Sequence, residues 1–339
     1  MDVIGSRNFS NKEYFGITSE TDRYCYASFM LLVFLLSFLG DSIVIVASIK
    51  YKALKLNSFL VGIIQQMAVS DIICCLVFPL PQFVSLMENS WVFGRVLCLL
   101  TSSLTTITLD VTRILTAIMT TARVMILLFP NSRVTRSLTQ RTAHIVGSAI
   151  WVAFLPRFFL TINLNKITDR TNFDYRICLC VYHVLATNLK DHAYIPILLS
   201  IFIFIPIALF TVTTGIILLH LRQARSSSRQ AGGMVRWQGY LTVTLTAVVF
   251  CLSNIPQMIY QFGILNTDKD TQNFYHNEFY RFAWASLSVN LFSDFFIYCI
   301  AVESFREFIK ERLQLIKSLV DAYLGALQEI IPSSSTFSC

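Results

Sequence analysis

Three aspartates carry the most informative chemistry in this sequence. Asp41, Asp71 and Asp294 are each the single acidic residue of a long apolar stretch. A carboxylate in hydrocarbon is costly unless it binds a cation, takes up a proton or is held by hydrogen bonds. We therefore expect these residues to hold a cation or a proton. The alternative is a structural cluster joined by hydrogen bonds.

Three further charged residues lie in apolar stretches. Asp110 and Arg113 are three residues apart, so on a helix they share a face and can form an ion pair. Arg157 either reaches toward lipid headgroups, as long cationic side chains do, or faces an acidic group of a ligand.

The elements that must position these groups are long apolar helices. Of the 339 residues, 55% are hydrophobic and 14% are charged, against about 25% charged in a soluble domain. A membrane-spanning helix takes about 20 mainly apolar residues. Seven stretches are long enough: 26–49, 58–85, 96–129, 144–163, 193–221, 239–265 and 281–302. The third and fourth are less apolar than the others and are assigned partly by their length and spacing. The predicted fold is an all-α membrane protein with a seven-helix bundle over residues 26–302.

The loops between the spans predict the orientation of the bundle. Three loops, near residues 50–55, 133–141 and 222–236, are basic and contain no acid, whereas the others mix both signs. Purely basic loops favour the cytoplasm, which places the N-terminus outside. Residues 1–25 are then an extracellular tail, in which Asn8 begins the N-x-S/T glycosylation signal of the chain.

The loops and motifs also exclude several classes of protein. The longest loop, about 164–191, is too short to form an enzymatic domain, and no P-loop, HExxH or GxSxG motif is present. The internal repeat that many transporters show is absent. No basic patch is interleaved with aromatic residues, so nucleic acid is not an expected partner.

A series of landmarks follows in order along the spans. Cys98 and Arg123 mark the two ends of the third span, and the remaining landmarks are Asp71, Trp151, Pro206, Phe250 with Pro256, and Asp294 with Tyr298. Their spacing over residues 25–315 resembles that of the rhodopsin-like G-protein-coupled receptors. The resemblance implies a plasma-membrane receptor in which an extracellular ligand drives the sixth span outward and activates a heterotrimeric G protein.

The resemblance also implies roles for individual residues. It implies a disulfide between Cys98 and either Cys178 or Cys180 in the second outer loop. It implies that Arg123 contacts the G protein when the helices open. The other residues expected to take part in activation are Phe250, Asn254, Pro256 and Tyr298.

Two departures from the family pattern bear on activation. Ala122 replaces the acid that usually restrains Arg123, and Arg236 lies near the position of a second restraining acid. We therefore expect a weakly restrained resting state and raised basal signalling. Asn254 replaces a tryptophan of the family pattern. Arg113 replaces an apolar residue, and its ion pair with Asp110 is either structural or part of the signalling pathway.

The resemblance brings the three aspartates together. It implies that Asp41, Asp71 and Asp294 face one another, with Thr112 and Asn290 nearby. In many relatives this pocket holds a sodium ion, and the matches of Asp71, Thr112 and Asn290 are among its ligands. No other cofactor is expected.

Missing chemistry narrows the choice of ligand. An amine receptor needs an aspartate where this chain has Thr105, and an opsin needs a lysine where it has Ser288. The position of Pro79 and the long 164–191 loop favour a peptide, with a small-molecule chemosensory ligand as the alternative. The candidate pocket residues are Thr105, Arg157, Gln257, Tyr260, Trp284 and Ser288, and helix packing is the preferred interpretation of the aromatic ones.

The C-terminal region predicts contacts with the membrane and with a regulator. Apolar residues recur at helical spacing over 303–320 with basic residues between them, which predicts an amphipathic helix on the inner leaflet. The tail, 321–339, ends in a cluster of hydroxyl residues: Ser333, Ser334, Ser335 and Thr336. Their phosphorylation is expected to add negative charge that recruits arrestin, and the alternative is a polar end that is only solvated.

Two other functions compete with a coupling receptor. The altered motifs around Arg123 and Asp294 allow a receptor-shaped scavenger that binds its ligand without coupling. The aspartates also allow a seven-helix cation channel or transporter, although that class does not explain Cys98 or Arg123.

Overall fold

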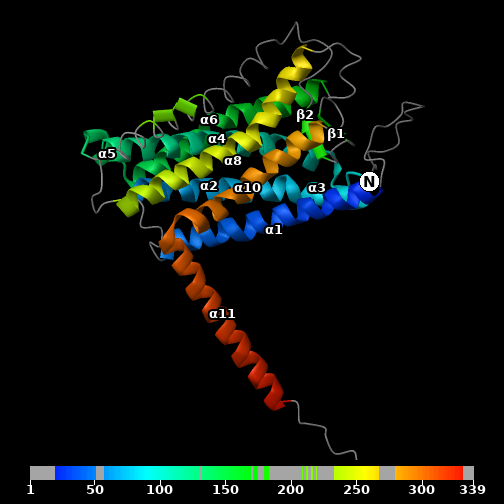
Figure 1. Ribbon diagram of the computed structural model, residues 1–339. Coiled ribbons are helices and arrows are strands. Elements are labelled where there is room, and N and C mark those ends of the chain that lie inside the picture. The colour runs from blue at the N-terminus through cyan, green and yellow to red at the C-terminus, as the bar shows by residue number, and fades with distance from the viewer. Residues whose placement is uncertain are drawn as a thin grey trace, which may run out of the picture.

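The computed structural model is a bundle of long helices with a β-hairpin at one end (Figure 1). It describes residues 20–50, 57–129, 131–168, 171–174, 179–182, 208, 211–212, 215–216, 219, 233–266 and 279–330. The helices are α1 (Glu20–Lys50), α2 (Ser58–Val77), α3 (Pro79–Glu88), α4 (Gly94–Leu128), α5 (Arg133–Ser137), α6 (Gln140–Thr168), α8 (Gly233–Asn266), α10 (Tyr280–Ala301) and α11 (Glu303–Ile330). The strands are β1 (Thr171–Asp174) and β2 (Leu179–Tyr182).

These helices coincide with six of the seven predicted spans. Helix α1, α2 with α3, α4, α6, α8 and α10 match the first to fourth, sixth and seventh spans. The fifth span, 193–221, lies largely outside the described residues, as does its landmark Pro206. Within it, scattered positions from Ala208 to Leu219 are described, and these are helical.

Four helical segments in the described part of the chain are long and apolar enough to cross a membrane. They are Glu20–Ile49, Ser58–Glu88, Leu241–Tyr260 and Tyr280–Ala301. Helices α4 and α6 have the length of a span but are more polar, in agreement with the weaker apolar character of the third and fourth stretches.

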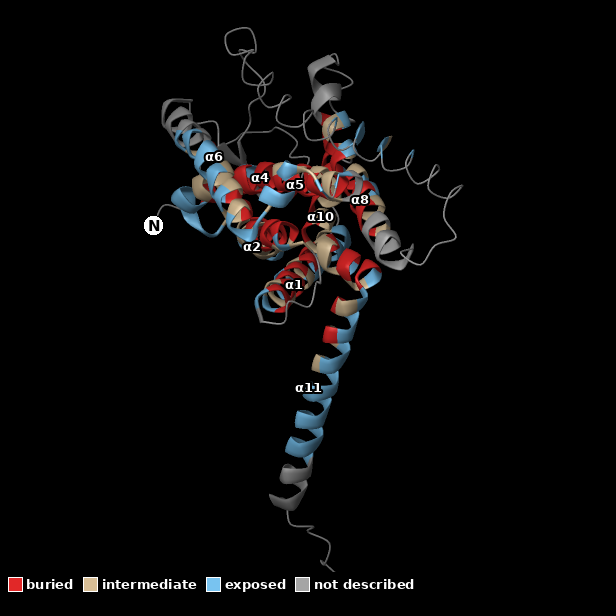
Figure 2. Cartoon of the chain, turned by 90° about the vertical axis from the view of Figure 1, so that its left-hand side faces the viewer, coloured by how far each residue is buried: buried red, intermediate tan, exposed pale blue. Residues whose placement is uncertain are grey.

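The distribution of side chains is the reverse of that in a soluble protein. Leu39, Val152 and Leu252 are 57%, 62% and 69% exposed on the outside of the bundle. Asp71 and Arg113, in contrast, are buried inside it. Figure 2 shows the buried residues gathered where the helices face one another. This arrangement suits a bundle surrounded by hydrocarbon, because polar side chains there must find partners inside the protein.

A pair of prolines breaks the second span into α2 and α3. Pro79 and Pro81 lack the backbone N–H that would donate to Cys75 and Val77 in a continuous helix. Helix α2 therefore ends at Val77. The carbonyl of Val77 instead accepts a hydrogen bond from Thr105 Oγ1 of α4, at 3.4 Å.

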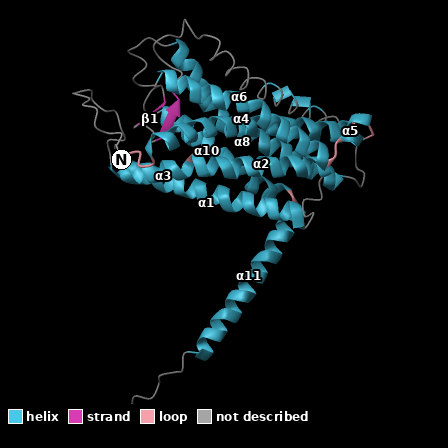
Figure 3. Cartoon of the chain, turned by 180° about the vertical axis from the view of Figure 1, so that it is seen from behind, coloured by secondary structure: helices cyan, strands magenta, loops and turns pink. Residues whose placement is uncertain are grey.

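The β-hairpin and the start of α11 mark the two ends of the bundle. The antiparallel strands pair Thr171 with Tyr182, and Figure 3 shows β1 near the start of α1. We call this the hairpin end and the opposite end, where α10 passes into α11, the α11 end. A disulfide joins Cys98 of α4 to Cys180 of β2 at the hairpin end. This selects Cys180 of the two predicted partners; Cys178 lies outside the described residues.

Two helices run beyond their predicted limits. Helix α1 begins at Glu20, inside the segment 1–25 expected to be a tail. Helix α11 continues past residue 320 to Ile330, because no proline interrupts it before Pro332. Phe305 and Phe308 are buried against the bundle, while α11 then leaves it (Figure 1), and its apolar side chains from Leu313 to Leu324 are exposed.

A glycine allows α2 and α6 to approach closely. A Cβ atom added at Gly62 would lie 2.6 Å from Cβ of Ala143, which is far inside van der Waals contact. Ala143 is fully buried, so it has little room to move away.

We expect Gly62→Ala to lower the thermal stability of the purified protein, because overpacking costs about 1–3 kcal/mol. Thermal unfolding in detergent measures the effect. Gly215→Ala is the matched control, since a Cβ atom there meets nothing within 4 Å. A Gly62 variant as stable as this control would show that the two helices can separate without cost.

Candidate functional site

Polar side chains on α4 mark successive levels inside the bundle. Thr105 lies toward the hairpin end, Asp110, Thr112 and Arg113 lie in the middle, and Arg123 lies toward the α11 end, all of them buried. A helix rises about 1.5 Å per residue, so about 15 Å separates the levels of Arg113 and Arg123. Helix α4 contacts α2, α6 and α8, which places these groups at the centre of the bundle.

Arg113 joins two helices in the middle of the bundle. Its Nη1 pairs with Asp110 Oδ1 at 2.9 Å, which confirms the predicted ion pair. Its Nε donates to Asn254 Oδ1 of α8 at 2.8 Å. Asn254 in turn donates from Nδ2 to the carbonyl of Phe250 at 2.9 Å and to Ser253 Oγ at 3.2 Å. The amide of Asn254 is therefore held with its oxygen toward the guanidinium.

The link between Arg113 and Asn254 was not predicted from the sequence. The signal that could have revealed it was that both positions depart from the family pattern with polar residues. The same network reaches α10, because Ser286 Oγ donates to the carbonyl of Ser253 at 3.1 Å. Helices α4, α8 and α10 are thus connected at one level.

The three aspartates lie on α1, α2 and α10 and interact electrostatically with one another. Asp41 Oδ2 accepts from Ser37 Oγ at 3.0 Å. Asp71 Oδ1 accepts from Thr112 Oγ1 at 2.9 Å. Asp71 Oδ2 is buried and has no hydrogen-bond partner among the described residues. One carboxylate oxygen therefore remains available to a small cation or a proton.

The described residues contain no group of three His, Cys, Asp or Glu side chains spaced to hold a metal ion. A cation at this level would therefore need neutral oxygens among its ligands. Thr112 Oγ1, which is within 3.0 Å of Ser70 Oγ, is such a neighbour of Asp71. Asn290 lies on α10, one turn before Asp294, and its backbone carbonyl accepts a hydrogen bond from Ser293 Oγ at 2.8 Å.

Arg123 is buried toward the α11 end of the bundle, where α4 faces α10. It is 5% exposed, and neither Nη1 nor Nη2 has a hydrogen-bond partner in the part of the chain that the structure describes. Tyr298 lies within electrostatic reach of Arg123 and donates from its hydroxyl to the sulfur of Met119 at 3.7 Å. Ala122 offers no acceptor, and the side chain of Arg236 lies outside the described residues. The guanidinium thus forms no direct ion pair among the described residues, although Asp294 of α10 attracts it electrostatically.

Aromatic rings link three helices nearer the hairpin end. The rings of Tyr260 and Tyr280 are 4.6 Å apart, and Trp284 meets Tyr280 at 6.3 Å and Phe78 at 5.4 Å. These contacts support helix packing as the role of Tyr260 and Trp284. Two polar atoms here are buried without a partner among the described residues, Trp284 Nε1 and Gln257 Oε1.

The remaining predicted residues divide into three groups. Thr105 donates to the break between α2 and α3, and Ser288 donates to the carbonyl of Ala285, so both hydroxyls are engaged within the bundle. Phe250 is buried and Pro256 lies inside α8. The residues or side chains outside the described part are Asn8, Arg157, Cys178, Ser333, Ser334, Ser335 and Thr336.

Comparison with known proteins agrees with this arrangement. Residues 40–298 match the family described as 7 transmembrane receptor (rhodopsin family), which covers more than half of the chain. The chain is also similar to Chemokine XC receptor 1 of Homo sapiens, with 32% identity over 156 residues. That alignment spans 45% of this chain and 43% of the human receptor.

The family consists of receptors, not enzymes, and its members are multi-pass proteins of the plasma membrane that act with extracellular ligands and G proteins. The apolar helices, the disulfide at the hairpin end and the match over residues 40–298 lead to one conclusion. The chain belongs to the rhodopsin family of seven-transmembrane, G-protein-coupled receptors.

Proposed function

We propose that this receptor binds a peptide or small protein of the chemokine class and transmits binding to a heterotrimeric G protein. The similarity to a chemokine receptor supports this ligand class. Thr105 and Ser288 stand where amine receptors and opsins need an aspartate and a lysine. A small-molecule chemosensory ligand is the second candidate, favoured by the unpaired Gln257 Oε1 and Trp284 Nε1 inside the bundle.

In this proposal the hairpin end faces outward and the N-terminus is extracellular. The disulfide between Cys98 and Cys180 supports the orientation, because disulfides persist in oxidising compartments. Helix α5 at the opposite end carries Arg133 and Arg136 without an acid, which favours the cytoplasm.

The observation that carries the mechanism is the link from Arg113 to Asn254. Gln257 lies one helical turn from Asn254 on α8, toward the hairpin end. A ligand that shifts this turn strains the hydrogen bond at Asn254, because Arg113 is held on α4 by Asp110. Breaking that bond releases α8 from α4. The cytoplasmic ends of the helices then separate and expose Arg123 to the G protein.

The restraint on Arg123 itself is weak in this mechanism. The guanidinium forms no direct ion pair among the described residues, so it is retained by burial and by electrostatic interaction with Asp294 and Tyr298 of α10. A buried charge without a directly contacting acid is only partly compensated, which raises the free energy of the closed bundle. Opening therefore relieves an unfavourable contact, and the receptor signals to some extent without ligand.

We expect cells that express the native chain to show ligand-free G-protein activation above an empty vector, and Arg123→Ala at matched surface expression to abolish it. A second-messenger assay measures both. Purified chemokines added to the same cells are expected to raise the signal of the native chain only.

Other outcomes of this assay would contradict the proposal in distinct ways. Chemokine uptake without any second messenger would establish a scavenger. An ionic current that depends on Asp71 would establish a channel. A response to small organic molecules alone would contradict the chemokine ligand class but would agree with the proposed coupling mechanism.

We expect substitutions of Asn254 to change basal signalling in opposite directions. Asn254→Leu removes the acceptor of a charge-assisted hydrogen bond worth about 1.5–3 kcal/mol, so basal signalling rises roughly tenfold or more, up to the assay maximum. Asn254→Asp gives Arg113 a charged acceptor and lowers basal signalling. The second-messenger assay at matched surface expression measures both. A change in the same direction for the two variants would show that the contact does not restrain α8.

We further propose that Asp71 binds a sodium ion in the resting receptor. The orphaned Asp71 Oδ2 and the neighbouring hydroxyls of Thr112 and Ser70 fit a small hard cation, which prefers oxygen ligands. Asp41 and Asp294 add negative potential at the same level. The ion would offset the mutual repulsion of the carboxylates and stabilise the closed bundle.

We expect sodium chloride to raise the unfolding temperature of the purified receptor by roughly 2 °C or more over choline chloride, because a bound ion stabilises the folded state. Asp71→Asn removes this difference. Asp22→Asn, which neutralises an exposed carboxylate on α1, is expected to keep it. An equal response of the native and Asp71 variants would favour a proton at this cluster.

A further inference from the structure

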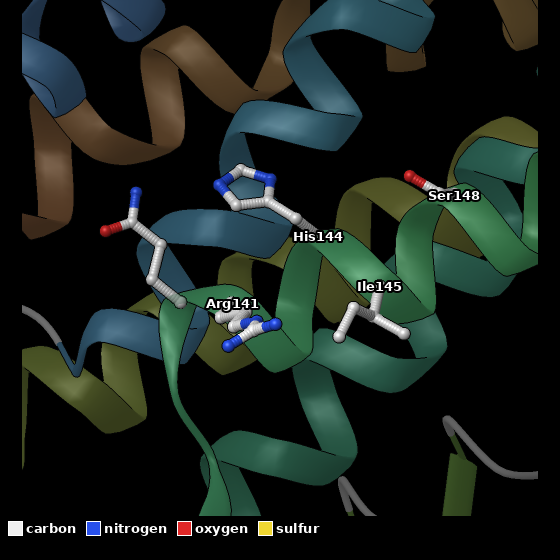
Figure 4. A pocket seen from close by; sticks show the side chains of 5 residues that line it. Arg141, His144, Ile145 and Ser148 are labelled. Carbon is white, nitrogen blue, oxygen red and sulfur yellow. The ribbon is translucent and has the colours of Figure 1, made fainter.

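A shallow surface groove, broadly open to its surroundings, lies on α6 near the α11 end, away from the residues that the mechanism uses. It has a volume of about 580 Å³ and is lined by Gln140, Arg141, His144, Ile145 and Ser148. Figure 4 shows the four labelled side chains along successive turns of α6. The groove opens to the surroundings of the bundle, so its occupant comes from there.

Cross-helix hydrogen bonds hold the polar wall of the groove. Gln140 Nε2 donates to Gln65 Oε1 at 3.2 Å, and Gln66 Nε2 donates to His144 Nδ1 at 3.1 Å. In Figure 4 His144 turns toward the neighbouring helix. A neutral imidazole that accepts at Nδ1 carries its proton on Nε2. The wall is thus ordered in advance and retains hydrogen-bond donors.

The electrostatic field at the groove favours an anion. Arg141 is exposed at its rim, and Arg136 on α5 is nearby in the chain. No Asp or Glu occurs anywhere between Asp110 and Asp169. A phosphate group would therefore meet a guanidinium and neutral donors without a competing carboxylate.

The groove extends from the expected membrane interface toward the hydrocarbon. Ser148 lies seven residues beyond Arg141, which is about 10 Å along the helix. Ile145 is 60% exposed, and Val152 and Phe159 continue the same seven-residue spacing with 62% and 59% exposure. An apolar strip thus leads away from the cationic rim. The occupant must be amphiphilic, with an anionic head and a long apolar chain.

We propose that this groove binds one anionic phospholipid of the inner leaflet. Arg141 pairs with the phosphate diester, the amide of Gln140 and the imidazole of His144 face the headgroup region, and one acyl chain lies along Ile145 toward Phe159. A single guanidinium matches a singly charged headgroup such as that of phosphatidylglycerol. The inference adds a lipid site to the receptor; it uses the proposed orientation but neither the ligand nor the coupling.

The test reconstitutes the purified receptor in nanodiscs of phosphatidylcholine with phosphatidylglycerol and counts retained lipids by native mass spectrometry. We expect one phosphatidylglycerol to survive on the native chain. Arg141→Gln is expected to lower its occupancy about tenfold, against less than about twofold for Arg136→Gln, which removes the same charge outside the groove. Ser148→Trp fills the groove at an exposed position, keeps Arg141 and is expected to remove the lipid as well.

Three results would overturn the proposal. Equal losses for the Arg141 and Arg136 variants would mean general attraction to a basic surface. Displacement of the lipid by inorganic phosphate would mean an anion site without a chain. Retention of phosphatidylglycerol by the Ser148 variant, or a retained sterol that is insensitive to Arg141, would mean that the groove holds a different occupant. Unfolding temperatures confirm that each variant is folded.

Discussion

A buried guanidinium organises the centre of this receptor. Arg113 lies in a bundle whose exterior faces hydrocarbon, where an unpaired charge costs several kcal/mol. It is tolerated because Asp110 neutralises it and Asn254 accepts its second hydrogen bond. Removing either partner leaves a buried charge that is only partly compensated. The pairing therefore holds α4 and α8 at a defined depth and rotation relative to each other.

The restraint on the bundle is distributed unusually along α4. Arg123, at the α11 end, has no ion pair among the described residues, whereas Arg113 near the middle is fully engaged. Because α4 is held firmly at Arg113 and less firmly at Arg123, we infer that α8 bends at the level of Asn254. Asp71 of the aspartate cluster lies at the middle level, where it accepts a hydrogen bond from Thr112, and a cation bound there would stabilise the closed state. In the proposed mechanism, signal transmission depends on how a ligand shifts one turn of α8.

Several features could be predicted from the residues alone. The apolar stretches identified the helices, because a span must satisfy its backbone hydrogen bonds internally and so needs a long apolar run. The three-residue spacing of Asp110 and Arg113 was sufficient for their ion pair. The limits of α1 and α11 were less predictable, since amphipathic and polar residues at a helix end do not mark the end by themselves. Proline marks the break after α2 at Pro79 and follows α11 at Pro332, but Pro156 and Pro256 lie inside helices, so proline alone does not locate a helix end either.

The sequence by itself determined the helices, their polar interior and the local ion pair, because each depends on residues close together in the chain. The tertiary structure decided which cysteine pairs with Cys98, that the carbonyl freed by Pro81 meets Thr105, and that Arg113 reaches Asn254. Arg113 and Asn254 are separated by 141 positions. Such contacts depend on the rotation and depth of each helix within the bundle, and packing between helices sets both.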